Sequence, residues 1–218
     1  MIKLIIFDLD GTLLYTLEDL ANSCNFVLEK YGQKKHAIAD YKYLVGSGVK
    51  MLLQKAFGEN FPSQYRQNIL DDFLQHYAVH QYDTTRPYTE IPMVLHILQE
   101  QNKMLAVASN KMDNATKLLI TEYFPTINFN IVAGATENLP TKPNPTIVNN
   151  IMDYCGVTSA ETLYIGDSDI DMETAKNAGV KSIGALWGYR TKKELTEAGA
   201  DFLALSPIDI IEIVANNK

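Results

Sequence analysis

Leu4-Ile5-Ile6-Phe7-Asp8-Leu9-Asp10-Gly11-Thr12, close to the N-terminus, is the stretch of sequence that decides the fold. Its four consecutive apolar residues predict a short strand that is buried on both faces, and a glycine turn follows the acidic pair at once. In extended geometry Asp8 and Asp10 would point the same way, and two such carboxylates repel each other unless a cation neutralises them. A polar strand end followed by an ordinary turn is the alternative interpretation.

Short apolar runs like the first one recur along the chain, and amphipathic stretches separate the later runs. The runs lie at residues 105–108, 131–133, 163–165, 182–185 and 202–205, and the stretches at 91–98, 116–123, 147–155 and 172–178. Runs without strict polar alternation are typical of a parallel sheet that is covered on both faces. Strand and helix in alternation predict right-handed βαβ units, and hence an α/β fold with a doubly wound, Rossmann-like parallel sheet.

A long helical segment interrupts this rhythm after the first apolar run. Residues 16–83 contain no buried-strand pattern, and amphipathic stretches at helical period lie at 17–31, 49–57 and 65–79. Gly32 follows the first stretch as a helix stop signal. We therefore expect a helical domain, residues 16–83, inserted into an α/β core domain that is built from residues 1–15 and 84–218.

The overall composition restricts the class of protein. Of the 218 residues, 46% are hydrophobic and 21% are charged, which is usual for a soluble globular chain. The 19 basic and 26 acidic residues give a net charge of −7, which argues against nucleic acid as a partner because such binding depends on basic surface. We expect a monomer or a homodimer.

The sequence also bears on where the protein works. No apolar stretch is long enough for a signal peptide or a membrane span. Cys24 and Cys155 lack the spacing of a zinc or redox site, so we interpret them as small core residues in a reducing compartment. We expect a cytoplasmic protein that does not bind membranes.

Gly166-Asp167-Ser168-Asp169-Ile170-Asp171 is a second acidic motif, placed between an apolar run and a helical stretch. Ligands of a doubly wound sheet bind beyond the carboxyl ends of the strands, so the two acidic motifs should meet there. Oxygen ligands from two strand ends suit Mg²⁺, which takes a few carboxylates and keeps other oxygens in its octahedron. Asp169 is better interpreted as a residue of the helix N-terminus, where its charge complements the helix dipole.

Two further segments offer groups for an anion. Ser109 and Asn110 follow the run at 105–108 and precede a helix, so a hydroxyl, an amide and free backbone N–H groups come together. Lys142 supplies a compact cation in Thr141-Lys142-Pro143-Asn144-Pro145, whose prolines stiffen the loop and favour a helix start. Each segment alone could be an ordinary loop or helix cap. Only the order of these segments along the chain indicates a function.

The order of these segments is that of the four motifs of the haloacid dehalogenase superfamily, which this chain resembles over nearly its whole length. DxDGT comes first, then a serine after an apolar strand, then Lys-Pro-x-Pro and Gly-Asp-x-x-x-Asp. The helical insert lies where that superfamily carries its helical C1 cap. Four smaller features resemble the phosphoglycolate phosphatase branch: Gly46-Ser47-Gly48, Pro87-Tyr88, Trp187-Gly188-Tyr189 and Ala200-Asp201.

The resemblance implies a mechanism for the acidic residues. Asp8 would be the nucleophile that attacks the phosphoryl group and forms an aspartyl-phosphate. Asp10 would protonate the leaving oxygen and then activate water as the general base. Asp8, the backbone carbonyl of Asp10, and Asp167 would hold Mg²⁺.

The same resemblance implies how the phosphoryl group is bound. Ser109, Asn110 and Lys142 would contact its oxygens, and Lys142 would also act in catalysis by balancing charge in the transition state. Thr12 and Asp171 would have supporting roles.

Two comparisons within the superfamily favour hydrolysis of a phosphate ester. The dehalogenase branch lacks the second aspartate, which is present here as Asp10, and the β-phosphoglucomutase branch usually has valine where Thr12 stands. A mutase-like phosphoryl transferase and a pyrophosphatase are alternatives within the superfamily. A non-catalytic phosphoacceptor or phosphate-binding domain is the alternative from another class. The acidic pair on one strand followed by the helical insert speaks against a phosphoacceptor domain, and the presence of both Asp8 and Asp10 speaks against a non-catalytic phosphate-binding domain.

The insert should decide the substrate, because closure of such a cap excludes water and brings contacts to the leaving group. Gly46-Ser47-Gly48 could present backbone N–H groups to a small carboxylate, with Lys50 as a charge partner, or it could be an ordinary helix cap. We expect a small anionic phosphorylated metabolite such as 2-phosphoglycolate. Tyr15 replaces the aspartate that is usual in this branch at the entry to the insert, which leaves the substrate open.

His76 and His80 stand four residues apart in the insert, which is a metal-ligand spacing. The glutamate of the zinc-binding HExxH motif is missing between them. A packed or solvated helix face is therefore the better interpretation of this pair.

Overall fold

The computed structural model describes residues 1–217, and the chain divides into two compact units. The core unit comprises Met1–Tyr15 and Pro87–Lys218, and the insert unit is Thr16–Arg86. The insert unit runs to Arg86 rather than Asp83, because Thr84 and Thr85 are bound to it. Their backbone N–H and hydroxyl groups all donate to the buried carboxylate of Asp19, at 2.6 to 3.2 Å. Polar contacts set this boundary, so an apolar pattern does not reveal it.

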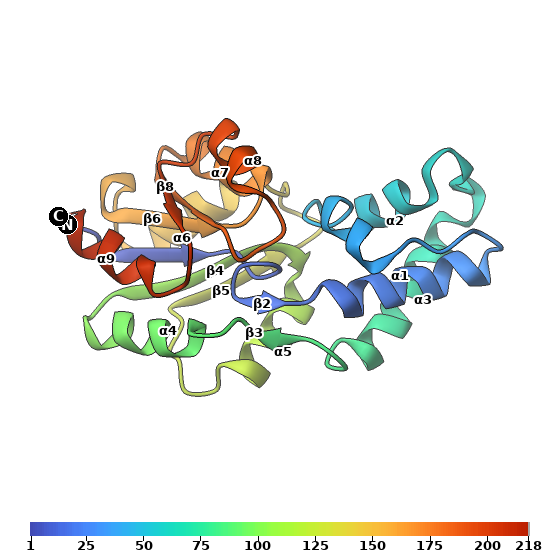
Figure 1. Cartoon of the computed structure of the whole chain (residues 1–218), viewed down its shortest axis with the longest axis horizontal. Helices are drawn as coiled ribbons and strands as arrows, with labels where there is room; N and C mark the ends of the chain where they lie inside the picture. The colour runs from blue at the N-terminus through green and yellow to red at the C-terminus, as the bar shows by residue number, and fades with distance from the viewer. Residues whose placement is uncertain (218) are drawn as a thin grey trace. The chain divides into compact units, whose positions relative to one another are not determined.

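A six-stranded sheet forms the centre of the core unit (Figure 1). Its strands, in spatial order, are β5 (Ile131–Ala135), β4 (Met104–Met112), β1 (Leu4–Phe7), β6 (Thr162–Gly166), β7 (Lys181–Ala185) and β8 (Phe202–Ala204). All neighbouring strands are parallel. The short strands β2 (Leu14–Tyr15) and β3 (Arg86–Pro87) form a separate two-stranded sheet.

The strand order reverses beside β1. After β1, the chain continues through β4 and β5 on one side, whereas β6, β7 and β8 extend the sheet on the other side. Residues 4–7 pair in register with 104–107 and with 162–165. The carboxyl ends of β1, β4 and β6 are therefore neighbours, and such a reversal is where doubly wound sheets bind their ligands.

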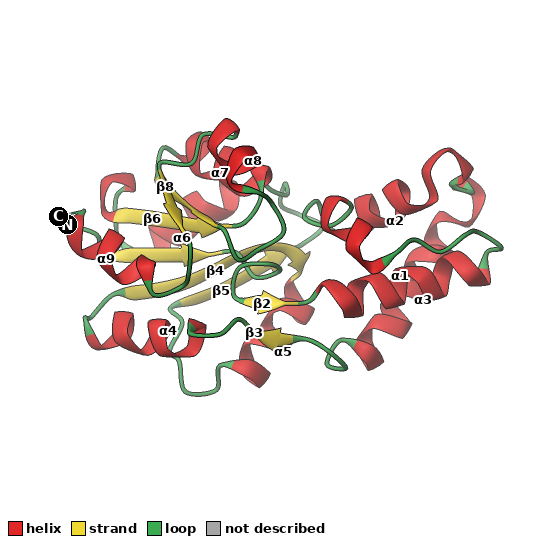
Figure 2. Ribbon diagram, viewed as in Figure 1, coloured by secondary structure: helices red, strands yellow, loops and turns green. Residues whose placement is uncertain are grey.

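Helices cover both faces of the six-stranded sheet, which confirms the predicted α/β class (Figure 2). They are α4 (Ile91–Glu100), α5 (Asp113–Tyr123), α6 (Thr146–Cys155), α7 (Asp169–Ala178), α8 (Lys192–Glu197) and α9 (Asp209–Asn216), with a 3₁₀ turn at Ser159–Glu161. Ile5 and Phe7 pack in one apolar cluster with residues of α4 and α9, whereas Leu4 and Ile6 pack in another with residues of α6 and α7. Burial on both faces explains why β1 shows no polar alternation.

The insert unit is built mainly from helices. These are α1 (Leu17–Lys30), α2 (Val49–Phe57) and α3 (Arg66–His80), with 3₁₀ turns at Ile38–Tyr43, Gly58–Asn60 and Ser63–Tyr65. The three α-helices agree with the predicted stretches to within one residue at each end. These 3₁₀ turns are too short to show a helical apolar stripe, which is why the apolar pattern misses them.

Aromatic residues fill the core of the insert unit only in part. Tyr41, Phe73 and Tyr77 are buried there, whereas Tyr43 and Tyr65 are about half exposed. Cys24 is also buried, and burial raises the pKa of its thiol to about 11, as expected for an unreactive core cysteine. None of the helices within residues 1–217 is long and apolar enough to cross a lipid bilayer.

Candidate active site

The end of β1 leads directly into a tight turn that carries Asp8 and Asp10. Asp8 is the first residue after the strand, and its backbone N–H donates to the carbonyl of Ile165 at 2.8 Å. The N–H of Leu14 returns to the carbonyl of Leu9 at 3.0 Å and closes the turn. Leu9, between the two aspartates, packs in the same apolar cluster as Ile5 and Phe7, so the alternation of the strand continues past Phe7. The carboxylates of Asp8 and Asp10 nevertheless bind different lysines, Lys142 and Lys111.

The end of β6 leads into α7 through a capping box. Ser168 is the N-cap residue, and its hydroxyl donates to Oδ2 of Asp171 at 2.6 Å while the Asp171 N–H donates to the Ser168 oxygen at 3.3 Å. Gly166 leaves room for this arrangement, since a Cβ there would lie 2.3 Å from the Cβ of Asp171. Asp169 is exposed in the first turn of α7, in agreement with its interpretation as a residue of the helix N-terminus. Its Oδ1 lies 3.4 Å from Nε of Arg190.

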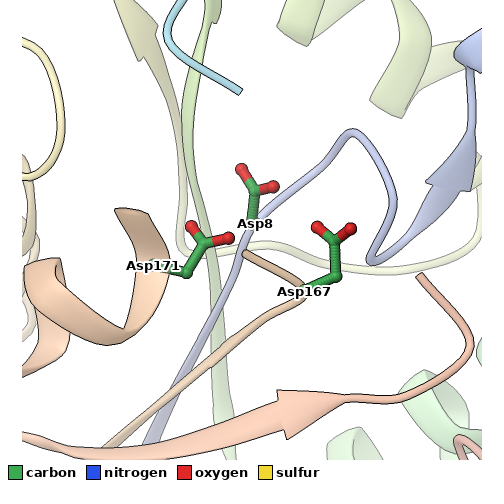
Figure 3. Close-up of side chains that lie close together, drawn as sticks. All are labelled: Asp8, Asp167 and Asp171. Atoms are coloured by element: carbon green, nitrogen blue, oxygen red, sulfur yellow. The ribbon is translucent and has the colours of Figure 1, made fainter. Parts of the chain in front are cut away.

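Asp8, Asp167 and Asp171 come together at these strand ends (Figure 3). One carboxylate oxygen of each residue lies within 4.8 Å of the other two, and all three residues are buried. Figure 3 shows the three carboxylates on the same side of the strand ends. The sequence predicts Asp8 and Asp167 as metal ligands and Asp171 as a neighbour, and the structure places all three in one cluster.

Lys142 lies within the same cluster, on the loop between β5 and α6. Its ammonium nitrogen lies 2.7 Å from a carboxylate oxygen of Asp8 and of Asp171, 2.9 Å from the hydroxyl of Tyr164 and 3.1 Å from the carbonyl of Ala108, so four acceptors surround its three N–H donors. Only 2% of its side chain is exposed. Tyr164 is a partner that sequence reasoning missed, although a hydroxyl within the apolar strand β6 is a signal that could have indicated one.

Burial of so many charges at one point perturbs their protonation. Burial raises the pKa of Asp8 to about 7; Lys142 opposes this shift, whereas the nearby Asp171 adds to it. Burial, together with the charges of Asp171 and Asp8, raises the pKa of Asp167 well above its usual range. Burial alone would lower the pKa of Lys142, but the two carboxylates beside it raise that pKa well above its usual value. The cluster therefore contains more buried negative charge than Lys142 can balance.

The segment after β7 holds Asp167 in place. The backbone N–H of Tyr189 donates to Oδ2 of Asp167 at 2.7 Å, and the hydroxyl of Thr12 lies 3.4 Å from Oδ1. Gly11 and Gly188 press against the same side chain, because a Cβ at either position would lie 2.3 Å or less from an Asp167 atom. Gly11 also has φ = 93°, which favours glycine. Tyr189 thus acts through its backbone, a contact that no side-chain pattern predicts.

Ser109 and Asn110, the predicted phosphate ligands, lie at the end of β4 and are both buried. The Asn110 side chain donates to the carbonyl of Lys142 at 3.1 Å and accepts from its N–H at 2.8 Å. This pair of bonds ties β4 to the loop that carries Lys142. The Ser109 hydroxyl oxygen accepts a bond from the N–H of Lys111 at 3.1 Å.

Lys111 is a second buried lysine at the site, and sequence reasoning assigned it no role. Its ammonium group donates to both carboxylate oxygens of Asp10, at 3.0 and 3.2 Å. Only 5% of the Lys111 side chain is exposed, against 16% for Asp10. Its position directly after Ser109-Asn110 is the signal that could have identified it.

The remaining predicted residues belong to the insert unit. Gly48 is the N-cap residue of α2, and within residues 1–217 no side chain caps the start of this helix. Lys50 lies in the first turn of the helix. Gly46 and Gly48 have φ values of 107° and 81°, so the loop around Ser47 requires glycine at both positions. This geometry fits both the helix-cap and the carboxylate-binding interpretations of the segment.

His76 and His80 form a packed face, as preferred from the sequence. Their rings stack at 4.3 Å between centroids, and the ring of His76 stacks on Phe26 at 4.2 Å. His76 Nδ1 lies 3.0 Å from the hydroxyl of Ser23, and His80 Nδ1 lies 2.8 Å from Asp83. Local packing and hydrogen bonds thus account for both imidazoles.

Comparisons with known proteins identify the family of this chain. The family model of haloacid dehalogenase-like hydrolases matches residues 5–185. A phosphoglycolate phosphatase of Aquifex aeolicus is 31% identical over 215 residues, which cover 99% of this chain and 98% of the relative. Another from Agrobacterium fabrum is 31% identical and covers 94% of this chain and 91% of its own.

Solved structures show the same fold over nearly all of the chain. A protein from Lactobacillus delbrueckii subsp. bulgaricus, provisionally assigned as a phosphoglycolate phosphatase, has a TM-score of 0.92 at 29% identity and covers 97% of this chain and 98% of its own. CbbY of Rhodobacter sphaeroides, solved with phosphate, has a TM-score of 0.80 at 22% identity and covers 96% of each chain. At that identity, CbbY supports the fold alone.

Proposed function

This chain belongs to the haloacid dehalogenase-like hydrolase family, as a phosphoric monoester hydrolase of its phosphoglycolate phosphatase-like branch, and from this premise we propose how it acts. Asp8 forms an aspartyl-phosphate with a small carboxylated phosphate monoester, and water then hydrolyses that intermediate. The observation that carries the proposal is the convergence of three buried carboxylates and Lys142 at the point where the strand order reverses.

Asp8 is the best nucleophile among these groups. It stands first after the central strand β1, and its contact with Lys142 holds one carboxylate oxygen in place. Carboxylates are established nucleophiles in phosphoryl transfer through a covalent intermediate. Lys142 offsets the negative charge that a phosphoryl group brings to the site.

Asp10 is the general acid and base in this proposal. It belongs to the same turn as Asp8 but pairs with a different lysine, Lys111, and its side chain is less buried than that of Asp8. A group that gives a proton to the leaving oxygen and later accepts one from water needs access to both. The separate environments of the two carboxyl groups suit two different roles.

The residues present fit Mg²⁺. Three buried carboxylates face one lysine, and the pKa values of Asp8 and Asp167 are raised, so the site favours a further cation. Hard oxygen donors that leave most of an octahedron to other oxygens suit Mg²⁺. Asp8, the backbone carbonyl of Asp10, and Asp167 would hold it, with Asp171 in support. When bound, Mg²⁺ would neutralise charge on the phosphoryl oxygens.

The phosphoryl group would be bound by Ser109, Asn110 and Lys142. Ser109 offers its hydroxyl near the end of β4. The side-chain amide of Asn110 bonds the backbone of Lys142 and so holds the loop that carries this lysine in place. Thr12 supports Asp167 from the turn after β1.

The insert unit would act as a cap, with residues 16–83 forming its body. In this proposal Gly46, Ser47 and Gly48 offer backbone N–H groups at the start of α2 to the substrate carboxylate, and Lys50 adds positive charge. The glycine-rich loop supports this role because the helix start lacks a side-chain cap within the described residues. A substrate of this class, a small phosphorylated metabolite, supports a cytoplasmic location for the protein.

A phosphatase panel tests the substrate. We expect Mg²⁺-dependent release of phosphate, with phosphoglycolate preferred over hexose phosphates and pyrophosphate, and no release in EDTA. Equal rates on phosphoglycolate and hexose phosphates would contradict the assigned substrate. Transfer of phosphate to a sugar phosphate instead of water would favour the mutase alternative, and undiminished turnover after exhaustive metal removal would contradict the metal site.

A further inference from the structure

Lys111 is a buried cation at the active site whose role the family motifs do not specify. Its ammonium group donates to both carboxylate oxygens of Asp10, at 3.0 and 3.2 Å. The contact joins residues that are 101 positions apart in the chain. A carboxylate that is bound through both oxygens loses its freedom to rotate about the Cβ–Cγ bond, so this pair fixes the orientation of Asp10.

The chain around Lys111 is shaped to deliver this side chain. Its N–H donates to the Ser109 hydroxyl oxygen at 3.1 Å, and its carbonyl accepts from the hydroxyl of Thr116 at 3.3 Å. The pairing of β4 with β5 shifts register between Ala108 and Met112, which places Lys111 in a bulge. Gly134 allows the close approach, because a Cβ there would lie 2.7 Å from the Lys111 carbonyl oxygen.

A buried lysine carries a desolvation cost that a purely structural position does not require. Methionine of similar length would fill the same space without a charge. The lysine therefore has a use that depends on its partner, and that partner is the side chain we propose as the acid and base.

We propose that Lys111 is a positioning residue that orients the Asp10 carboxyl group for proton transfer to the leaving oxygen. The inference rests on the proposed function, since it assigns Lys111 to the same reaction. In this proposal Lys111 acts through the Asp10 side chain and does not contact the phosphoryl group.

A double-mutant cycle on the holoenzyme with Mg²⁺ tests this inference. Lys111→Met, Asp10→Asn and the double variant are compared by kcat/KM on the best alkyl phosphate of the panel. We expect Lys111→Met to lower kcat/KM by about 10 to 100-fold. This is less than the rate enhancement of about 10² to 10⁴-fold that a positioned general acid supplies, because the acid itself is still present. In the Asp10→Asn background, the same substitution should change kcat/KM by less than about twofold, because the group it positions is already lost.

The leaving group provides a second readout that a merely structural role would not move. p-Nitrophenolate departs without a proton, so Lys111→Met should reduce kcat/KM for p-nitrophenyl phosphate far less than for the alkyl phosphate. Lys111→Arg, which keeps a charged donor, should restore most of the alkyl phosphate activity. Equal losses on both substrates would overturn the inference, and so would a full further loss in the Asp10→Asn background, which would mean that Lys111 contacts the substrate itself.

Lys117→Met is the matched control, since it removes an exposed lysine that pairs with Asp113 at 2.7 Å on α5. It should leave kcat/KM unchanged for both substrates. If the unaltered protein releases no phosphate from any monoester, the proposed function fails; if it is active and Asp10→Asn is impaired while Lys111→Met equals the unaltered protein, only the inference about Lys111 fails.

Discussion

Lys142 and Lys111 are two buried lysines that each bind an aspartate of the turn after β1, and their surroundings differ. Lys142 lies between Asp8 and Asp171, whose side chains are 9% and 1% exposed. Lys111 binds Asp10, which is 16% exposed. The first lysine is part of a buried charge cluster and governs its charge balance, whereas the second meets its partner nearer to solvent and governs orientation.

The largest expected effect comes from the cluster around Lys142. Asp8→Asn should reduce Mg²⁺-dependent phosphate release to background, because a carboxamide is a poor nucleophile and a poor metal ligand. Circular dichroism and thermal unfolding should show an intact fold. Asp169→Asn, a change to an exposed aspartate of the second motif, serves as the control and should keep near-normal turnover. Turnover near the unaltered rate in Asp8→Asn would contradict the nucleophile assignment.

Stability separates the two lysines directly. Lys142→Met leaves Asp8 and Asp171 buried without their cation, and breaking a buried pair in this way costs about 3–5 kcal/mol of unfolding free energy. Lys111→Met should cost only about 1–2 kcal/mol, since Asp10 retains access to water. Urea unfolding in EDTA measures both changes. Equal losses for the two variants would refute the distinction between a charge-balancing and an orienting lysine.

A smaller effect concerns pH. Asp8 has a folded pKa of about 7 against an ordinary value of 3.8, so between these values the folded state holds a proton that the unfolded state has released. The free energy of unfolding in EDTA should therefore fall as pH rises from about 4 to 7, with a slope of up to about 1.4 kcal/mol per pH unit from this group. Asp167 is shifted in the same direction and adds to the fall.

The pH experiment compares unfolding in urea at several pH values with EDTA and with excess Mg²⁺. Mg²⁺ should reduce the decline, because a bound cation stabilises the ionised carboxylates. Asp8→Asn should reduce it in EDTA as well, whereas Lys111→Met should leave the slope unchanged. A stability that rises with pH across this window in EDTA would contradict the assigned charge balance.

Much of the fold follows from the sequence because its signals are local. The uninterrupted run Leu4–Phe7 predicts a strand buried on both faces, and helical apolar stripes predict α1, α2 and α3 to within one residue at each end. The carboxyl ends of parallel strands lie at one edge of a sheet, so Asp8 and Asp167 were expected to meet. These inferences need only periodicity and chain order.

Other contacts could not be predicted because they depend on three-dimensional proximity. Lys111 meets Asp10 across 101 positions, and Tyr164 meets Lys142 from within an apolar run. The boundary of the insert unit depends on hydrogen bonds from Thr84 and Thr85 to Asp19. No residue pattern encodes such polar pairings, since each requires a particular side-chain direction.

The sequence by itself determined the α/β class, the helical insert, the four motifs and the candidate residues of the site, because strand and helix periods and motif spacing are written along the chain. Only the tertiary structure decided which lysine serves which aspartate. Asp8 and Asp10 stand two residues apart after β1, yet the end of β4 and the β5–α6 loop bring a different amine to each. Charges in a buried site are balanced by neighbours in space, which chain order alone does not specify.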